Sequence, residues 1–425
     1  MSFYILWVVA KNVTYQQETH FIHQGAEPDP TTGSTQPPIY QTASFAYDDP
    51  QQLEDVFNGK AFGYYYSRVT NPTTDALEKR LAGIENGLGA AVVSSGMAAI
   101  STTILSLASS GDTIVVGKSL FGSTYYLFEG LITDCGINVK FVDSTNLAEF
   151  KEAINEKTAL LFVEAIGNPK LDIPDLKALS LLANQHNIPL VVDTTFATPV
   201  LLDAKSHGVH IVVYATTKYI AGSGTTVGGA VIDTGVMNWK TYQRKKIQES
   251  YKQYGQFAFL AALKKIRSNA GSNQSPFNAY LTSLGIDTLA LRVKQQATNA
   301  TKLAIFFEKQ AAINHINYPG LNTHKQHLLA GEQFKSLFGS MITIRLGTKE
   351  RAFRVLKELK LVHNLVNLGD AKTVAVYPAT TIYRNITESQ QEEAGVYPDL
   401  IRISVGLEHS DDLIADFKQA LEAVS

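Results

Sequence analysis

The sequence predicts an α/β fold in which a large domain with a mainly parallel sheet precedes a smaller α+β domain. Three observations support this prediction. The chain has 425 residues, which is more than a single hydrophobic core usually serves. Its middle part alternates short apolar runs with helical stretches, and its last third mixes isolated strands with helices. Parallel sheets of this kind are covered on both faces and bind ligands at the carboxyl ends of their strands.

The elements follow in order along the chain. Residues 1–70 contain many turn formers and little periodicity, which predicts an extended N-terminal arm. The large domain is expected over residues 71–270, and it begins with a helix from Thr73. The apolar runs that predict its strands are 113–116, 139–143, 160–165, 190–195 and 211–215. A polar, basic break near 235–275 separates them from the smaller domain, which is expected over residues 271–425.

The smaller domain begins with a long helical stretch near residues 275–310, which indicates a connector. Further on, apolar runs alternate with helical patterns. The segments that predict strands are 341–346, 373–378 and 401–406, and those that predict helices are 349–360 and the stretch from Asp411.

The composition excludes several kinds of partner. The 37 basic and 39 acidic side chains give a formal charge of −2, so we expect no nucleic-acid partner. The single cysteine, Cys135, excludes an intramolecular disulfide and favours a reducing, cytoplasmic location; we expect it to be buried, and we expect no metal site. The apolar run at residues 3–10 is too short to span a bilayer, so we expect no membrane partner. A frayed leader is the favoured interpretation of this run, and a membrane or partner contact is the alternative.

Lys218 is the first candidate for chemistry. It lies in IVVYATTKYIAGSGTTVGG, where an apolar strand delivers the lysine to its carboxyl end and glycines follow. Desolvation there lowers the pKa of an amine and makes it nucleophilic towards a carbonyl, whereas a lone lysine is usually solvated. The glycines have a nucleotide-binding loop as an alternative interpretation, but Val227 occupies the third glycine position of G-x-G-x-x-G.

Two further segments carry candidate ligand groups. Asp193 ends the apolar run of PLVVDTTFATP, and a buried carboxylate needs a cation such as a pyridinium nitrogen; a turn or cap aspartate is the alternative. Ser95 and Gly96 precede a predicted helix, whose free N–H groups could hold a phosphate. An ordinary capped helix start explains the second segment equally well.

Taken together, these segments resemble the pyridoxal-phosphate-dependent enzymes of cysteine and methionine metabolism over residues 18–421. The matching segments include PDPTTGS, YSRVTNPTTDALEKR, SSGMAAI, AIGNPKLDI, VVDTTFATP, TTKYIAGSGTTVGG, NLGDAKT and IRISVGLE. Within this family the chain is most similar to the O-acetylhomoserine sulfhydrylases. The resemblance implies the fold of type I pyridoxal-phosphate-dependent transferases, and it implies pyridoxal 5'-phosphate as the cofactor.

The resemblance also implies roles for individual residues. Lys218 would be the catalytic residue and would hold the cofactor covalently, while Asp193 would pair with the pyridine nitrogen. The other residues expected at the cofactor are Ser95, Gly96, Met97, Phe121, Asn168, Thr195 and Thr217, with Tyr66 and Arg68 reaching it from a neighbouring subunit. An amino-acid substrate would be bound by Arg402, Asn168 and Asn367. A homodimer or homotetramer with shared active sites is therefore expected.

The activity implied is γ-replacement on O-acetyl-L-homoserine with sulfide or a thiol, which gives homocysteine or methionine plus acetate. A cystathionine γ-synthase and a methionine or cystathionine γ-lyase are alternatives with the same chemistry, and a non-catalytic protein that binds pyridoxal phosphate is an alternative of another class. Phe121 stands where the family usually has a tyrosine, which favours an ester substrate because acetate leaves with little acid help. Other departures from the family pattern are Ala215 in place of a serine, and Tyr214, Ser223, Tyr377 and Tyr383 in place of histidines.

Overall fold

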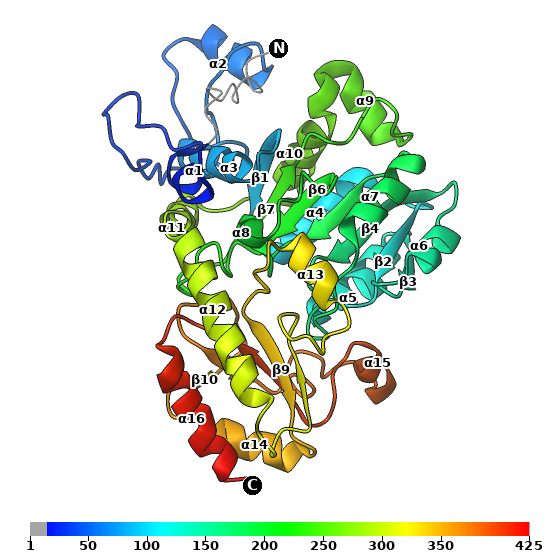
Figure 1. Ribbon diagram of the computed structural model, residues 1–425. Coiled ribbons are helices and arrows are strands. Elements are labelled where there is room, and N and C mark those ends of the chain that lie inside the picture. Colours follow the sequence, from blue (N-terminus) through cyan, green and yellow to red (C-terminus); the bar gives the residue numbers. More distant parts are fainter. Residues whose placement is uncertain (1–14, 425) are drawn as a thin grey trace.

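A computed structural model describes residues 15–424, and the apolar run at 3–10 lies outside this range. The strands of the described chain form two sheets (Figure 1). The larger sheet has the order β1-β7-β6-β5-β4-β2-β3. Its strands are β1 (Gly89–Val93), β2 (Thr113–Gly117), β3 (Asn138–Val142), β4 (Thr158–Glu164), β5 (Leu190–Asp193), β6 (Ile211–Tyr214) and β7 (Gly229–Asp233).

Five neighbouring strands of this sheet, β3, β2, β4, β5 and β6, are parallel. Strand β7 runs antiparallel to both of its neighbours, β6 and β1. Alternate side chains of β4 enter two different cores: Leu161 and Val163 face one, and Leu160 and Phe162 face the other. Both faces of the sheet are therefore covered, which explains the nearly continuous apolar strands. The helices of this part are α3 (Pro72–Ile84), α4 (Gly96–Leu107), α5 (Gly122–Tyr126), the π-helix η1 (Leu127–Ile132), α6 (Leu147–Ala153), α7 (Leu176–Gln185), α8 (Thr198–Leu201), α9 (Lys245–Tyr254), the short η2 (Gly255–Phe257) and α10 (Ala258–Ala270).

The smaller sheet has the order β10-β11-β12-β9-β8 and lies beside helices α12, α14 and α16. The long helix α12 runs down the side of the molecule from the larger sheet towards the smaller one (Figure 1). The strands are β8 (His315–Asn317), β9 (Met341–Arg345), β10 (His363–Asn364), β11 (Val374–Val376) and β12 (Leu400–Ser404). The helices are α11 (Pro276–Ile286), α12 (Leu289–Phe307), α13 (His327–Gln333), α14 (Lys349–Glu358), α15 (Glu388–Glu393) and α16 (Ser410–Glu422).

The predicted α/β class is confirmed, with differences in detail. The five apolar runs form β2 to β6, and the described part of the arm, residues 15–70, contains two helices, α1 (Gln17–His23) and α2 (Pro50–Phe57). The basic break near 235–275 is α9 and α10, and Cys135 is exposed, so the expectation that it is buried was wrong. The helix η1 ends just before this cysteine, whose turn faces solvent. The domain boundaries at residues 70 and 270 stay predictions.

No helix within residues 15–424 is long and apolar enough to cross a membrane. In the same range, His, Cys, Asp and Glu side chains form no group of three or more that could hold a metal ion.

Candidate active site

Lys218 follows the buried strand β6 and lies close to a loop of the smaller sheet. Its Nζ donates a hydrogen bond of 2.8 Å to Oδ1 of Asn367, which follows β10. Burial, assisted by the nearby charge of Arg402, lowers the pKa of the Lys218 amine to about 8. An appreciable part of the amine is therefore unprotonated near neutral pH, as a nucleophile or a base requires.

Arg402, on β12, lies in contact with the same loop. It is 2% exposed, and its guanidinium donates to Oδ1 of Asn168 at 3.1 Å and to the backbone oxygen of Asn367 at 3.3 Å. Burial lowers the pKa of Arg402, but a guanidinium remains charged. Among residues 15–424 no carboxylate forms a salt bridge with it. Asn168, Asn367 and Arg402, together called the carboxylate clamp below, can therefore bind a ligand carboxylate.

Asp193 lies at the carboxyl end of β5, in register with Glu164 at the end of β4. The backbone N–H of Thr195 donates to Oδ1 of Asp193 at 2.8 Å. Burial raises the pKa of the Asp193 carboxyl to about 6, because no cation is paired with it in the described part of the chain. A protonated ring nitrogen placed here would supply the missing positive charge.

The first turn of α4 lies beside the segment that leads to Lys218. Ser95 caps this helix by accepting from the N–H of Ala98 at 3.1 Å, and a Cβ added at Gly96 would lie 2.6 Å from Cβ of Ala215. The N–H of Ala215 in turn donates to Oγ1 of Thr195 at 3.0 Å. The sequence-predicted residues Ser95, Gly96 and Thr195 therefore come together at one edge of the sheet.

The glycines after Lys218 make this close approach possible. A Cβ at Gly229 would lie 2.1 Å from the backbone oxygen of Ser95, so no larger residue fits there. The hydroxyl of Thr217 donates to the oxygen of Gly228 at 3.2 Å, and the N–H of Gly228 donates back at 3.0 Å. Met97 is half-buried in the first turn of α4. The helix start, with its free N–H groups and positive dipole end, can bind a phosphate.

Glu164 was missed by the sequence analysis. Its buried carboxylate accepts from the N–H of Phe121 at 2.7 Å and from the backbone N–H of Asn168. Burial, together with the nearby charge of Asp193, raises its pKa well above the usual range. The signal that could have identified it is the one used for Asp193, an acid at the end of an apolar strand.

Tyr66 and Arg68 contact each other, and Arg68 also contacts helix α10. The Arg68 guanidinium donates to the backbone oxygen of Ser268 at 2.6 Å, and its central carbon lies 5.2 Å from the centre of the Tyr66 ring. Both side chains are exposed, and within the described chain neither forms a hydrogen bond with Lys218 or Asp193. Within the described chain, therefore, no hydrogen bond links either residue to Lys218.

The four residues that stand in place of histidines, Tyr214, Ser223, Tyr377 and Tyr383, differ in the groups to which they hydrogen-bond. The hydroxyl of Tyr214 donates to the buried Glu85, and that of Tyr377 donates to the oxygen of Pro398 at 3.0 Å. Ser223 lies within hydrogen-bonding distance of the Thr225 hydroxyl, at 3.1 Å. Only for Tyr383, among these four, does a hydrogen bond reach the carboxylate clamp: its hydroxyl donates to the backbone oxygen of Asn168 at 2.7 Å.

The arrangement combines a desolvated amine, a carboxylate that lacks a cation, a helix start that can hold a phosphate and an arginine that can hold a second carboxylate. These are the groups that pyridoxal phosphate and an amino acid need, so the residues present fit this cofactor.

Comparisons with known proteins agree with this conclusion. The O-acetyl-L-homoserine sulfhydrylase of Leptospira meyeri is 37% identical over 430 residues, which cover 96% of this chain and 97% of that protein. A putative O-acetylhomoserine (thiol)-lyase of Campylobacter jejuni, solved with a pyridoxyl-lysine monophosphate, is 33% identical with a TM-score of 0.91 over 96% of this chain and 100% of that one. A cystathionine γ-lyase of Lactobacillus plantarum, solved with L-serine, is 30% identical with a TM-score of 0.85 over 96% and 99%. The family model described as Cys/Met metabolism PLP-dependent enzyme matches residues 18–422, and the chain belongs to this family of enzymes, whose cofactor is pyridoxal phosphate.

Proposed function

We propose that this enzyme replaces the γ-acetoxy group of O-acetyl-L-homoserine with sulfide or a thiol, which gives homocysteine or methionine plus acetate. The observation that carries the proposal is the hydrogen-bonded series from Lys218 through Asn367 and Arg402 to Asn168. In this series an amine of lowered pKa is linked through Asn367 to a buried arginine that could hold an amino-acid carboxylate, which supports the proposal. The names of the Leptospira and Campylobacter relatives support the ester substrate.

The bound cofactor would supply an electron sink for negative charge at the α carbon of the substrate. The residues that would hold pyridoxal phosphate are Lys218, Asp193, Ser95, Gly96, Met97, Phe121, Asn168, Thr195 and Thr217. The guanidinium of Arg402 would bind the substrate carboxylate through two parallel hydrogen bonds, and its bonds to Asn168 and Asn367 fix the orientation of the guanidinium. A carboxylate held by Arg402 would orient the α C–H bond towards the amine of Lys218. The chain thus uses binding energy to orient the proton that must move.

Lys218 would act as the base, because its amine has a lowered pKa and lies beside the carboxylate clamp. Its amine would take the proton from Cα, pass that proton to the bound cofactor, and then as a neutral amine take one proton from Cβ, after which the Cγ–O bond would break and acetate would leave. Sulfide or a thiolate then bonds to Cγ, and the two protons return to Cβ and Cα. The phenyl ring of Phe121 carries no proton donor, which suits a leaving group that departs as a carboxylate.

We also propose that the enzyme is a homodimer or homotetramer with shared active sites, located in the cytoplasm, with no nucleic-acid or membrane partner. The exposure of Tyr66 and Arg68 supports a role for them in the site of a neighbouring subunit. An arm up to residue 70 and a division into two domains near residue 270 are part of the same proposal; residue 270 is the end of α10, between the last strand of the larger sheet and the first strand of the smaller one.

The purified holoenzyme, given O-acetyl-L-homoserine and sulfide, should form homocysteine and acetate in equal amounts, and Lys218→Ala should not. Omission of sulfide separates the alternatives, because a γ-lyase would release 2-oxobutyrate and ammonia at an undiminished rate. Cysteine offered in place of sulfide would yield cystathionine faster than homocysteine if the enzyme is a cystathionine γ-synthase. A protein that binds pyridoxal phosphate and forms none of these products would contradict the proposal.

A further inference from the structure

The hydroxyl of Tyr383 contacts two segments of the larger domain. It donates to the backbone oxygen of Asn168 at 2.7 Å and lies 3.1 Å from the backbone oxygen of Leu120. The side chain is 1% exposed, so water does not replace these contacts. One residue of the C-terminal part therefore joins the loop before Phe121 to the loop that carries a member of the carboxylate clamp.

Glu164 joins the same two loops by the opposite kind of hydrogen bond. Its carboxylate accepts from the N–H of Phe121 and from the N–H of Asn168, whereas Tyr383 faces the carbonyl oxygens of Leu120 and Asn168. Donors and acceptors of both loops are thus satisfied by two buried side chains. Loss of either side chain would leave buried backbone groups without a partner.

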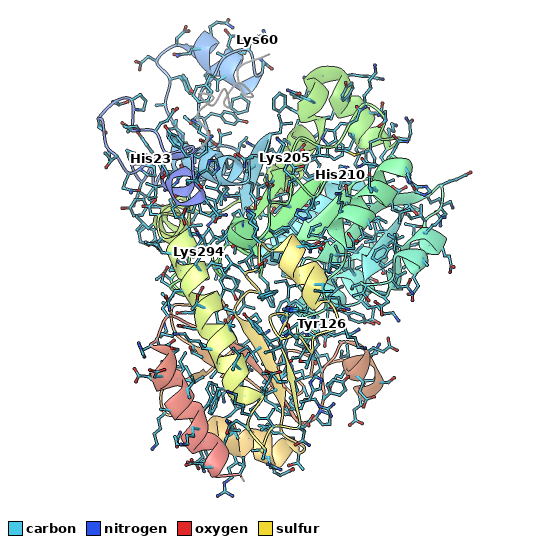
Figure 2. All side chains as sticks on the ribbon, viewed as in Figure 1. His23, Lys60, Tyr126, Lys205, His210 and Lys294 are labelled. Atoms are coloured by element: carbon cyan, nitrogen blue, oxygen red, sulfur yellow. The ribbon has the colours of Figure 1, made fainter. Side chains whose placement is uncertain are left out.

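The segment that carries Tyr383 is attached to the larger domain at several further points. The N–H of Asn385 donates to the hydroxyl of Tyr126 at 3.1 Å, and Lys118 forms a salt bridge of 3.3 Å with Glu393. Figure 2 places Tyr126 between the larger sheet and the segment near α15. A Cβ added at Gly122 would lie 2.7 Å from the oxygen of Ile382, so the two segments are in direct contact.

We propose that Tyr383 is a positioning residue that fixes the carboxylate clamp relative to Phe121. This inference rests on the proposed binding of a substrate carboxylate by Arg402. Oδ1 of Asn168 accepts from Arg402, and its backbone oxygen accepts from Tyr383, so the hydroxyl limits how far Asn168, and with it the guanidinium, can move. The phenol stands at a position where histidine was expected, and it supplies a donor that reaches both loops.

The experiment compares Tyr383→Phe with Tyr377→Phe. Both substitutions remove a buried hydroxyl that donates to a backbone oxygen in the same part of the chain, but Tyr377 donates to Pro398, away from the clamp. L-Norvaline, a straight-chain amino acid with no leaving group, is titrated into each holoenzyme and followed by the absorbance of the cofactor. We expect the Kd of Tyr383→Phe to rise roughly threefold to tenfold, the loss of about one hydrogen bond, and that of Tyr377→Phe to stay within about twofold. Tyr383→His, which keeps a ring N–H, should lie between them.

Equal Kd values for the two phenylalanine variants would overturn the proposal. If Tyr383→Phe does not fold, Gly122→Ala gives a second test, because its methyl group displaces Ile382 and hence Tyr383; an unchanged Kd for norvaline would again overturn it. The titration requires no turnover. If the wild-type enzyme binds norvaline but forms no homocysteine, the proposed function is wrong. The inference about Tyr383 is still tested in that case, because it depends only on the Kd values of the two phenylalanine variants.

Discussion

The hydrogen bond between Lys218 and Asn367 orients the amine without raising its pKa much, because the acceptor is a neutral amide oxygen. An amide oxygen orients the amine through a hydrogen bond of 2.8 Å without adding the negative charge that would hold a proton on it. Burial can then lower the pKa of Lys218 to about 8. A carboxylate at the same place would favour the protonated form and oppose this effect.

Asn367→Asp tests this interpretation through the pH dependence of kcat. The base must be unprotonated, so activity is lost as the pH falls below its pKa, and raising that pKa moves the acid limb of the profile to higher pH. We expect a shift of about one unit or more, with kcat at pH 7 reduced about tenfold. Asn364→Asp adds the same charge at an exposed position on β10 and should leave the limb in place. An unmoved limb in Asn367→Asp would show that the amide does not set this pKa.

At the residue scale the sequence identified the groups that end strands and missed those that depend on tertiary contacts. Lys218 and Asp193 follow apolar runs, so their position at the edge of the sheet could be inferred from local pattern. Glu164 has the same pattern, but its partners, the N–H groups of Phe121 and Asn168, come from separate loops. The contact of Tyr383 with Asn168 spans 215 residues of sequence, and no local pattern indicates it.

At the element scale, helix α10 holds α3 and β1 together through a buried ion pair. Arg267 donates to the carboxylate of Glu78 on α3 and to the backbone oxygens of Val92 and Val69, the latter at 2.8 Å. Lys264 donates to the other carboxylate oxygen of Glu78 at 2.7 Å. Burial alone would raise the pKa of Glu78, but the two cations outweigh it and lower the pKa. The pair also fixes the chain just after Tyr66 and Arg68.

Arg267→Met should lower the free energy of unfolding by about 3 kcal/mol or more, because it leaves the Glu78 carboxylate buried with a single partly exposed cation. Lys265→Met removes a positive charge from an exposed position on the same helix, and its effect should stay within about 0.5 kcal/mol. Urea unfolding at one fixed protein concentration measures both values. Replacing Glu78 by Leu in the Arg267→Met background should recover part of the loss; a further loss would argue against an unpaired charge as its cause.

The same helix shows why the segment near 235–275 was predicted as a break. Its basic residues suggest a solvated stretch, yet Arg267 is 4% exposed. The guanidinium of Arg267 is buried because it pairs with Glu78, which lies 189 residues earlier in the sequence. Strands β1 and β7 were missed because each begins with a glycine, which is not typical of strands. The glycine at position 229 is required by a tertiary contact, its close approach to Ser95. By contrast, β2 to β6 carry their information locally, as buried apolar runs between turns.

At the scale of the whole molecule, the candidate site needs both sheets. Lys218 follows a strand of the larger sheet, and Asp193 ends another. Arg402 lies on a strand of the smaller sheet, and Asn367 forms hydrogen bonds with Lys218 and Arg402. A contact between the two parts is therefore a condition for chemistry as well as for stability. The proposal of shared sites extends the same reasoning to a second subunit, because Tyr66 and Arg68 are exposed and form no hydrogen bond with Lys218 in the described chain.

Mixing two inactive variants tests whether the sites are shared. Lys218→Ala lacks the amine, and the double variant Tyr66→Ala, Arg68→Ala lacks the residues proposed to reach the neighbouring cofactor. In a hybrid dimer one site receives both defects and the other receives neither, so co-expression with random pairing should restore about a quarter of the wild-type sites. Lys218→Ala co-expressed with a differently tagged copy of itself should restore none. If each site used Tyr66 and Arg68 of its own chain, every site in the hybrid would carry one defect, and no activity would return.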